Sequence, residues 1–298
     1  MIDTKCAICG NNKNTKVLYK ETLDIKKINS KIFSARRIPD RTHYRFLKCE
    51  KCGMIFSNPI MSENKIGLLY SDSDFNYNAE AEYLKKTYFR YFKKYLLKNN
   101  SKNIKVLEIG CGNGFFLEEL VGNEIKNVYG IEPGKASVEK ADKEIKKNIK
   151  ISILRKGLFP KEIFDIICCF HTLDHVTDPN EFISTVYSLL KKGGKIFFIV
   201  HNTNALSVKM FGEKSPIFDI EHIYLFDSKS LKTVFQKSGF SNLKVFNVSN
   251  TYPLQYWLKL FPMFHLLKVN ILKLFNITKL GLFPISLNAG NIGIVGSK

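Results

Sequence analysis

The stretch KVLEIGCGNGFF, residues 105–116, joins a short apolar run to three glycines and then to a second apolar run. The first run predicts a buried strand, and the glycines suit a tight turn from that strand into a helix. The next strand-like segment, NVYGIE, ends on Glu132. A carboxylate at this place can accept hydrogen bonds from both ribose hydroxyls of a nucleoside. The stretch therefore predicts a βαβ unit that binds a nucleoside-containing cofactor.

The spacing of the glycines narrows the choice of cofactor. Gly110, Gly112 and Gly114 alternate as GxGxG, whereas the dinucleotide pattern GxGxxG puts its third glycine three residues after the second. This spacing favours S-adenosylmethionine over NAD. A purely structural explanation stays open, because a tight turn needs glycine whether or not a ligand binds there.

Strand-like and helix-like segments alternate through the rest of the chain. Such alternation predicts an α/β fold with a mostly parallel sheet that is covered on both faces, closed by an antiparallel last pair. Residues 251–288 are too long for a hairpin loop, so they predict a helical insertion. We expect strands at 104–110, 127–132, 149–154, 164–170, 195–200, 243–249 and 291–298, and helices at 80–98, 114–123, 136–147, 180–190 and 230–239.

Four cysteines near the N-terminus have the spacing of a metal site. Cys6 and Cys9 form one CxxC pair, Cys49 and Cys52 form a second, and a glycine follows each pair. Four thiolates favour tetrahedral zinc, and a closed site of this kind leaves no position for water, so the zinc would be structural. Unrelated buried or free cysteines are the alternative. We divide the chain into a zinc-binding module at 1–58, a linker and helix at 59–100, and an α/β domain at 101–298.

The formal charge of +19 suggests an acidic partner, but lysines spread along the chain supply most of it. Four of the six arginines lie between Arg36 and Arg45, and nucleic acid is not the partner that we expect. The first residues lack an apolar signal core, which predicts a cytoplasmic protein. The insertion is too rich in lysine to span a bilayer. We expect a helical lid there, and a peripheral contact with the inner face of the membrane is the alternative.

Several motifs together resemble a known family. VLEIGCGNGFF, GIEPG, HTLDHVTDP and LKKGGKIFFIV are similar to the successive motifs of class I S-adenosylmethionine-dependent methyltransferases. CAICG, FLKCEKCGMIFSNP and LLYSDSDFNY are similar to the zinc-ribbon module of bacterial sugar and surface-polysaccharide methyltransferases. The resemblance implies a Rossmann-like methyltransferase domain behind a zinc ribbon.

The resemblance also implies a set of cofactor contacts. The glycines would line the methionine part of S-adenosylmethionine, Glu132 would bind its ribose, and residues 170–173 would flank the sulfonium. The segment LRKGLFPKEIF lacks the acidic residue that often contacts adenine. The full set implied is Glu108, Gly110, Cys111, Gly112, Gly114, Glu132, Pro133, Phe170, His171 and Leu173.

Candidate catalytic residues come from two segments. Glu221 and His222 resemble the Glu-His pair of the sugar C-methyltransferases, in which the histidine acts as base, although Asp219 stands where that motif has a tyrosine. His171 is the other candidate, at the end of the fourth expected strand. His175 is expected to cap the helix that follows. A metal site of His171, His175 and Asp174 is a further alternative, and Tyr70 and Tyr77 are expected to pack beneath the zinc module.

We therefore expect methyl transfer from S-adenosylmethionine to a hydroxyl of a sugar nucleotide, glycan or glycolipid intermediate. Oxygen is preferred to carbon, because the chain ends before the additional C-terminal domain of the C-methyltransferases. The alternatives are a sugar C-methyltransferase, an RNA methyltransferase, and a non-catalytic protein that kept the fold. The sequence leaves the acceptor and the oligomeric state open.

Overall fold

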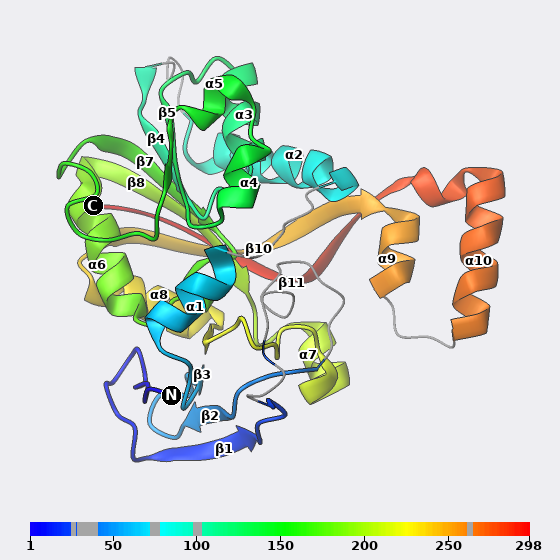
Figure 1. Cartoon of the computed structure of the whole chain (residues 1–298), viewed down its shortest axis with the longest axis horizontal. Helices are drawn as coiled ribbons and strands as arrows, with labels where there is room; N and C mark the ends of the chain where they lie inside the picture. The colour runs from blue at the N-terminus through cyan, green and yellow to red at the C-terminus, as the bar shows by residue number, and fades with distance from the viewer. Residues whose placement is uncertain (25–27, 29–40, 72–77, 98–102, 261–264) are drawn as a thin grey trace.

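A seven-stranded sheet forms the centre of the protein (Figure 1). The structure is a computed structural model that describes residues 1–24, 28, 41–71, 78–97, 103–260 and 265–298. The strand order is β10-β11-β8-β7-β4-β5-β6, and β11 runs antiparallel to both of its neighbours. The predicted sheet, mostly parallel with an antiparallel last strand, is therefore confirmed. Its strands are β4 (Val106–Ile109), β5 (Val128–Glu132), β6 (Ile149–Ile151), β7 (Phe164–Phe170), β8 (Leu190–His201), β10 (Ser241–Pro253) and β11 (Pro284–Ser297).

Helices cover both faces of this sheet because its strands are apolar on both sides. One apolar cluster joins the sheet to α2 (Asn78–Tyr95), α3 (Phe115–Gly122), α4 (Lys135–Glu139) and α5 (Lys143–Lys146). The other cluster joins the opposite face to α1 (Glu63–Ser71), α6 (Pro179–Leu189) and α8 (Ser228–Lys237). Alternate residues of one strand point to opposite faces, so Ile167 belongs to one cluster and Cys168 to the other.

The helices differ from the sequence prediction in two ways, since one predicted helix is divided and unpredicted short helices are present. The helix expected at 136–147 is two short helices, because the Asp142 side chain accepts a hydrogen bond from the Glu144 backbone N–H and begins α5 anew. Helix α1 was not predicted. Its sequence contains Gly67, and Ile66 is its one fully buried residue, so its apolar periodicity is weak.

The N-terminal segment forms a second, smaller sheet with the strand order β1-β2-β3-β9. Its first three strands are β1 (Thr15–Tyr19), β2 (Phe46–Cys49) and β3 (Ile55–Ser57). The fourth, β9 (Tyr224–Leu225), comes from far along the chain and pairs antiparallel with β3. The small sheet is therefore joined to the larger domain through main-chain hydrogen bonds.

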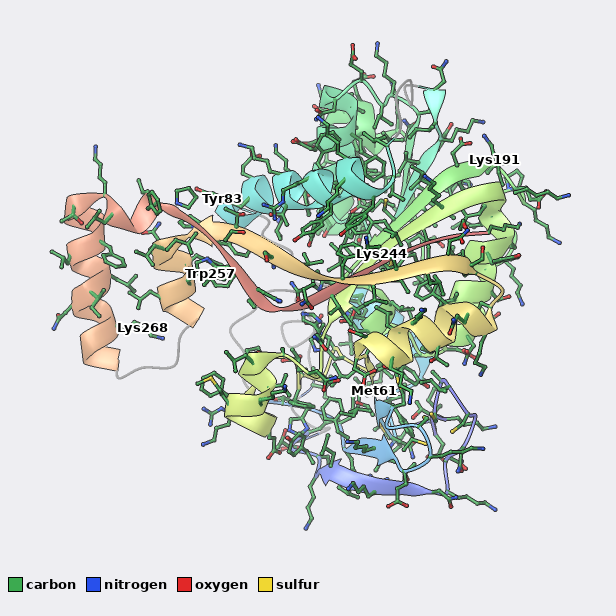
Figure 2. The ribbon with its side chains drawn as sticks, turned by 180° about the vertical axis from the view of Figure 1, so that it is seen from behind. Met61, Tyr83, Lys191, Lys244, Trp257 and Lys268 are labelled. Carbon is green, nitrogen blue, oxygen red and sulfur yellow. The ribbon has the colours of Figure 1, made fainter. Side chains whose placement is uncertain are left out.

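Strands β10 and β11 extend beyond the central sheet and carry an arm that projects from the body (Figures 1 and 2). The arm contains α9 (Leu254–Leu260) and α10 (His265–Thr278), followed by a 3-10 turn, Leu280–Leu282. The Trp257 indole N–H donates to the Ile285 carbonyl at 2.9 Å and ties α9 to β11. Among the described residues, no helix is long and apolar enough to cross a membrane. A further short helix, α7 (Leu206–Phe211), precedes a 3-10 turn, Gly212–Lys214.

Candidate active site

A cavity of about 1250 Å³ opens where the parallel strands of the central sheet end. Gly110, Glu132, Phe170 and His201, at or just beyond the carboxyl ends of β4, β5, β7 and β8, line its wall. Ligands bind at this edge of open α/β sheets because the turns there are free to vary. The volume exceeds that of a usual single-ligand pocket, so the cavity has room for a cofactor and an acceptor together.

The turn after β4 has the geometry that the glycine motif predicts. Gly110 has φ +75°, and a Cβ atom built on it would lie 2.1 Å from the Thr172 hydroxyl oxygen. Gly114 has φ +79°, and its Cβ would lie 2.7 Å from a methyl carbon of Ile145. The first glycine therefore leaves space beside the cavity, whereas the third lets α3 pack against α5. Both sites are in the left-handed region that glycine adopts without strain.

Glu132 is held firmly at the end of β5. Its two carboxylate oxygens accept backbone hydrogen bonds from Gly112 at 2.9 Å and from Gly134 at 2.8 Å. Burial raises the pKa of Glu132, and these two N–H groups oppose that rise. Each oxygen keeps a second lone pair, so the carboxylate can still accept the ribose hydroxyls that the sequence assigns to it.

Glu108, on β4, is a buried carboxyl group with an incomplete environment. Its Oε2 atom has no hydrogen-bond partner within the part of the chain that the structure describes. Burial, together with the charge of Glu132, raises the pKa of Glu108 well above its usual range. Glu108 also lines the cavity. A cationic ligand group beside it would supply the missing partner.

The expected cofactor residues divide into three groups. Six of them line the cavity, namely Glu108, Gly110, Glu132, Pro133, Phe170 and His171. Gly112 and Gly114 shape the turn from outside the cavity wall. Cys111 and Leu173 have side chains that are buried in the two apolar clusters on opposite faces of the sheet, so only their backbone atoms could meet a cofactor. Leu173 lies in a tight 3-10 turn, Leu173–His175, and its side chain points into the core.

Four histidines gather around Asp174 in one part of the cavity. The rings of His171 and His201 have centroids 4.6 Å apart, and those of His201 and His222 are 4.5 Å apart. The His175 ring meets His222 edge to face at 5.0 Å. All four histidines line the cavity, and Asp174 is fully buried beneath them. The strands β7 and β8 and the segment before β9 therefore bring together residues that are far apart in the sequence.

Asp174 and His201 form a close pair. Asp174 Oδ2 lies 2.6 Å from His201 Nδ1, so this ring nitrogen donates to the carboxylate. Burial alone would raise the pKa of Asp174, but the charge and hydrogen bond of His201, with the charges of His175 and His222, hold it well below its usual range. The sequence analysis missed His201. Its one signal was its place as the final residue of the apolar strand that ends KIFFIVH.

His222 and its neighbours Glu221 and Asp219 line the same cavity. His222 Nδ1 lies 2.8 Å from the Ile217 carbonyl oxygen, to which it can only donate. Burial, and then the charges of His201 and His175, lower the pKa of His222 well below its usual value. Because Nδ1 donates to the carbonyl, the neutral form of the imidazole carries its lone pair on Nε2.

His175 and Tyr70 are corrections to the sequence analysis. The helix after His175 is capped by Asp178, whose carboxylate accepts the Asn180 and Glu181 backbone N–H groups. His175 Nδ1 instead lies 2.8 Å from the Tyr70 hydroxyl, and both residues line the cavity. Tyr70 is thus a cavity residue as well as a packing residue. Tyr77 lies outside the described residues.

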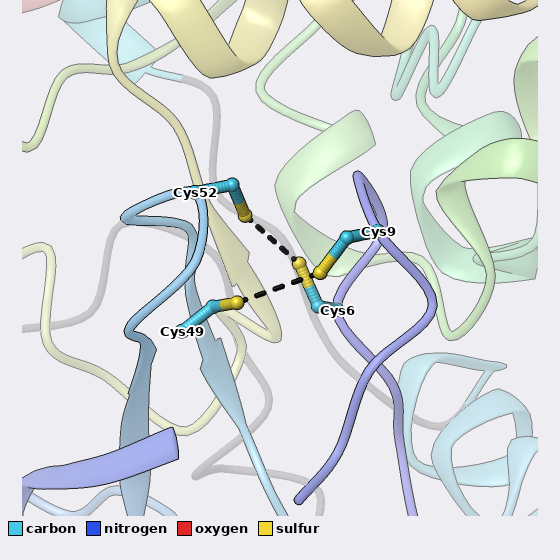
Figure 3. A group of neighbouring side chains, drawn as sticks. All are labelled: Cys6, Cys9, Cys49 and Cys52. Atoms are coloured by element: carbon cyan, nitrogen blue, oxygen red, sulfur yellow. Dashed lines mark hydrogen bonds between the residues drawn. The ribbon is translucent and has the colours of Figure 1, made fainter. Parts of the chain in front are cut away.

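The four N-terminal cysteines converge as their spacing predicts (Figure 3). The Sγ atoms of Cys6 and Cys52 are 3.3 Å apart, those of Cys9 and Cys49 are 3.5 Å apart, and all four thiols are free. Zinc bonded to four sulfurs at about 2.3 Å requires sulfur separations of about 3.8 Å, so the cluster can close around the ion with small shifts. The donor set therefore fits structural zinc.

The arginine cluster expected at 36–45 is only partly described. Arg36 and Arg37 lie outside the described residues. Arg41 lines the cavity, and the Arg45 side chain donates through Nε to the Asn58 carbonyl at 3.0 Å. Arg45 is therefore engaged within the small sheet.

Known proteins resemble the chain over its central part. A family model described as a methyltransferase domain matches residues 81–245. The tRNA U34 carboxymethyltransferase of Campylobacter fetus subsp. fetus is 27% identical over 158 residues, which are 51% of this chain and 56% of that enzyme. The ubiquinone biosynthesis O-methyltransferase of Pseudomonas putida (strain W619) is 34% identical over 106 residues, 34% of this chain and 45% of that enzyme.

A solved structure supports the same fold. The SAM-dependent methyltransferase of Archaeoglobus fulgidus aligns with a TM-score of 0.51 and 24% identity, covering 73% of this chain and 94% of that one. The chain spans about half the length of the curated relatives that it matches. The family match includes more than half of the chain, from α2 through β10. The chain belongs to the methyltransferase domain family, and its central domain has the Rossmann-like fold of a class I methyltransferase.

Proposed function

We propose that the enzyme methylates a hydroxyl group of a sugar-containing acceptor, namely a sugar nucleotide, a glycan or a glycolipid intermediate. The observation that carries this proposal is the division of one large cavity into two chemically different halves. Glu108, Gly110 and Glu132 line one half, and the histidine cluster lines the other. The two halves meet at Phe170 and His171, where an acceptor could face the cofactor.

The cofactor half fits S-adenosylmethionine, whose sulfonium supplies an electrophilic methyl group. Glu132 would hold the ribose hydroxyls, and the cationic amino group of the methionine part would complete the environment of Glu108. Gly110 leaves room for the methionine part because its missing Cβ would otherwise fill the space next to Thr172. These residues bind and orient the cofactor, which makes the methyl transfer effectively unimolecular.

The acceptor half has to remove the hydroxyl proton as the new carbon–oxygen bond forms and the carbon–sulfur bond breaks. We assign this proton to His201 Nε2. The Nδ1 atom of His201 already donates to Asp174, so the carboxylate fixes the tautomer and would stabilise the imidazolium that forms. His222, the base that the sequence suggested, has its Nδ1 on a neutral carbonyl oxygen, so it lacks the hydrogen-bonded carboxylate that would stabilise an imidazolium on His201.

Polar groups in this half suit a polyhydroxylated acceptor. Asp219 and Glu221 present carboxylates to the cavity, and Asn250 presents a buried side-chain amide. The Asn250 Oδ1 atom has no hydrogen-bond partner among the described residues, and a sugar hydroxyl would satisfy it. Tyr256 and Trp257 add aromatic surface against which a sugar ring can pack.

We propose that the cysteine module holds one structural zinc ion. Its first turn contacts the methyltransferase domain directly, because the Ala7 carbonyl accepts from Asn180 and the Ile8 carbonyl accepts from Lys237. These two donors belong to α6 and α8. The zinc would therefore stabilise a surface on which the acceptor half depends.

The arm is the feature of the structure that favours an acceptor attached to lipid. Tyr256 and Trp257 of α9 line the cavity, and apolar side chains of the arm are exposed, including Leu274, Leu282 and Phe283. We propose that these exposed side chains rest on a membrane that carries the acceptor, and Lys268 of α10 lies on the same arm (Figure 2). Co-sedimentation with anionic vesicles tests this. A Phe283→Ser variant should bind less, whereas Val17→Ser, an exposed apolar residue of the small sheet, should bind as the parent does.

Transfer of radiolabelled methyl groups tests the acceptor class. Purified enzyme is offered sugar nucleotides, polyprenyl-linked glycans, bulk tRNA and hydroxylated quinone precursors in parallel. We expect label in a sugar-containing acceptor, and a His201→Ala variant should lose more than 100-fold in kcat while binding S-adenosylmethionine normally. Label in tRNA, with binding that weakens steeply with salt, would replace this proposal with RNA methylation.

A further inference from the structure

A second cluster of metal-binding groups lies at the floor of the cavity, separate from the cysteines. Asp174, His175 and His222 each offer one ligand atom, and these atoms lie within 4.8 Å of one another. Two histidines and one carboxylate are a common set of ligands for divalent transition metals. His222 comes from a segment far from the other two, so the fold, and not local sequence, creates the triad.

The carboxylate has an oxygen that the protein leaves unused. Asp174 Oδ2 accepts from His201, but Asp174 Oδ1 has no hydrogen-bond partner among the residues that the structure describes. His175 Nε2 lies 3.8 Å from it, which is too long for a hydrogen bond. A fully buried carboxylate oxygen without a partner is costly, and a cation would remove that cost.

In both His175 and His222 the Nδ1 atom makes a hydrogen bond, which leaves Nε2 available to bind a metal. His222 Nδ1 donates to the Ile217 carbonyl, so the lone pair is on Nε2. Tyr70 is hydrogen-bonded both to His175 Nδ1 and to the Glu221 side chain. With the Tyr70 hydroxyl donating to Glu221, His175 Nδ1 donates to Tyr70 and its Nε2 also carries a lone pair. Metal-binding histidines in proteins are usually oriented in this way, through the other ring nitrogen.

We propose that Asp174 Oδ1, His175 Nε2 and His222 Nε2 bind one divalent transition-metal cation. Three protein ligands leave coordination positions open, and His175 and His222 both line the cavity, so the open positions face the acceptor. His201 is a positioning residue for this metal, because it holds the other oxygen of the same carboxylate. This role is compatible with its part in proton transfer, which uses Nε2.

The role of the cation rests on the proposed function. A hydroxyl oxygen of the acceptor would occupy an open position, and the cation would lower the pKa of that hydroxyl. His201 then takes the proton, the oxygen attacks the methyl carbon, and the carbon–sulfur bond breaks. The sulfonium loses its positive charge when the carbon–sulfur bond breaks, and the hydroxyl proton of the acceptor passes to His201. The step therefore needs no other reactant.

Metal binding can be measured without cofactor or acceptor. Protein whose cysteine site is filled with zinc is titrated with Mn²⁺, and free Mn²⁺ is followed by electron paramagnetic resonance. A parallel titration with Co²⁺ is followed by visible absorption, where cobalt in the cysteine site would reveal itself by thiolate charge transfer. We expect one ion per chain, bound in competition by the two metals.

Two site variants and one control variant test where the metal ion binds. Asp174→Asn and His222→Gln should each weaken binding at least tenfold, and using both guards against one of them failing to fold. Asp165→Asn is the matched control, since this aspartate lies at the opposite end of β7 and pairs with Lys191. It should bind the metal as the parent chain does. Absence of binding for both metals, or binding that both site variants leave unchanged, overturns the proposal.

The two proposals can fail separately. If one ion binds at this triad but no sugar acceptor is methylated, the metal site stands and the acceptor class is wrong. If a sugar acceptor is methylated at full rate by protein that retains only its zinc, the metal proposal fails and the acceptor class stands.

Discussion

The Ser57 hydroxyl donates a hydrogen bond to the backbone carbonyl of His222, with an oxygen–oxygen distance of 3.2 Å. The Ser57 backbone N–H also donates to the next carbonyl, that of Ile223, at 2.8 Å. Ser57 is the last residue of β3 in the cysteine module, whereas His222 lies in the cavity. The module therefore helps to hold the acceptor half of the active site, although its cysteines lie outside the cavity wall.

Replacing Ser57 with alanine tests this connection. Ser57→Ala removes one buried hydrogen bond, which should lower the free energy of unfolding by about 1 kcal/mol. We expect kcat to fall several-fold, because His222 loses a support, while the Kd for S-adenosylmethionine stays within twofold. Calorimetry and steady-state kinetics measure the two effects. Ser71→Ala, which removes an exposed hydroxyl that donates to Leu68, is the control and should change neither.

Loss of one cysteine tests the zinc and its structural role. Cys9→Ser should reduce bound zinc from one ion per chain to nearly none and lower Tm by several degrees, since the turn that contacts α6 and α8 loses its cross-link. Elemental analysis and thermal denaturation provide the measurements. Cys111→Ala removes a buried thiol outside the module and should keep its zinc. Equal zinc contents in the two variants would contradict the assignment.

The sequence predicted the fold, and it placed the β4 turn and Glu132 beside one another as the structure has them, for a physical reason. The β4 turn and Glu132 lie within one βαβ unit, so local spacing alone brings them together. The acceptor half is different, because His201 and His222 meet Asp174 only through the sheet order and the β3–β9 pairing. No spacing rule predicts such contacts. Leu173 shows the same limit, since a 3-10 turn decides which neighbouring side chains enter the cavity.

The first glycine of the motif allows a test of the cofactor half. Gly110→Ala would place a Cβ 2.1 Å from the Thr172 hydroxyl oxygen at a φ of +75°, so the turn has to move. We expect the Kd for S-adenosylmethionine to rise more than tenfold. Gly193→Ala is a close match, because φ there is +73° and no described atom lies within 4 Å of the new Cβ. It should show only the backbone cost of about 1 kcal/mol in stability and bind the cofactor normally.

Because the Glu108 carboxyl group is buried, we expect cofactor binding to release a proton from it. In the free protein, burial and the charge of Glu132 raise the pKa of Glu108 well above its usual range, so the group keeps its proton to a higher pH than an exposed carboxyl group does. A bound ammonium group favours the ionised carboxylate and lowers that pKa. Between the two pKa values, binding expels a proton, so affinity rises with pH until the free enzyme is itself ionised. The comparison is made below about pH 6.5, where the amino group of the cofactor is almost fully charged and its own titration does not contribute.

Calorimetry in two buffers of different ionisation enthalpy measures this proton. We expect the apparent binding enthalpy of the parent enzyme to depend on the buffer, and that of a Glu108→Gln variant to depend on it much less. The variant should also bind more weakly at pH 7, because the amide cannot pair with the ammonium group. Glu119→Gln, on the partly exposed surface of α3, is the matched control and should behave as the parent does. Heats that do not change with the buffer in the parent would show that Glu108 is not the partner of the cofactor's amino group.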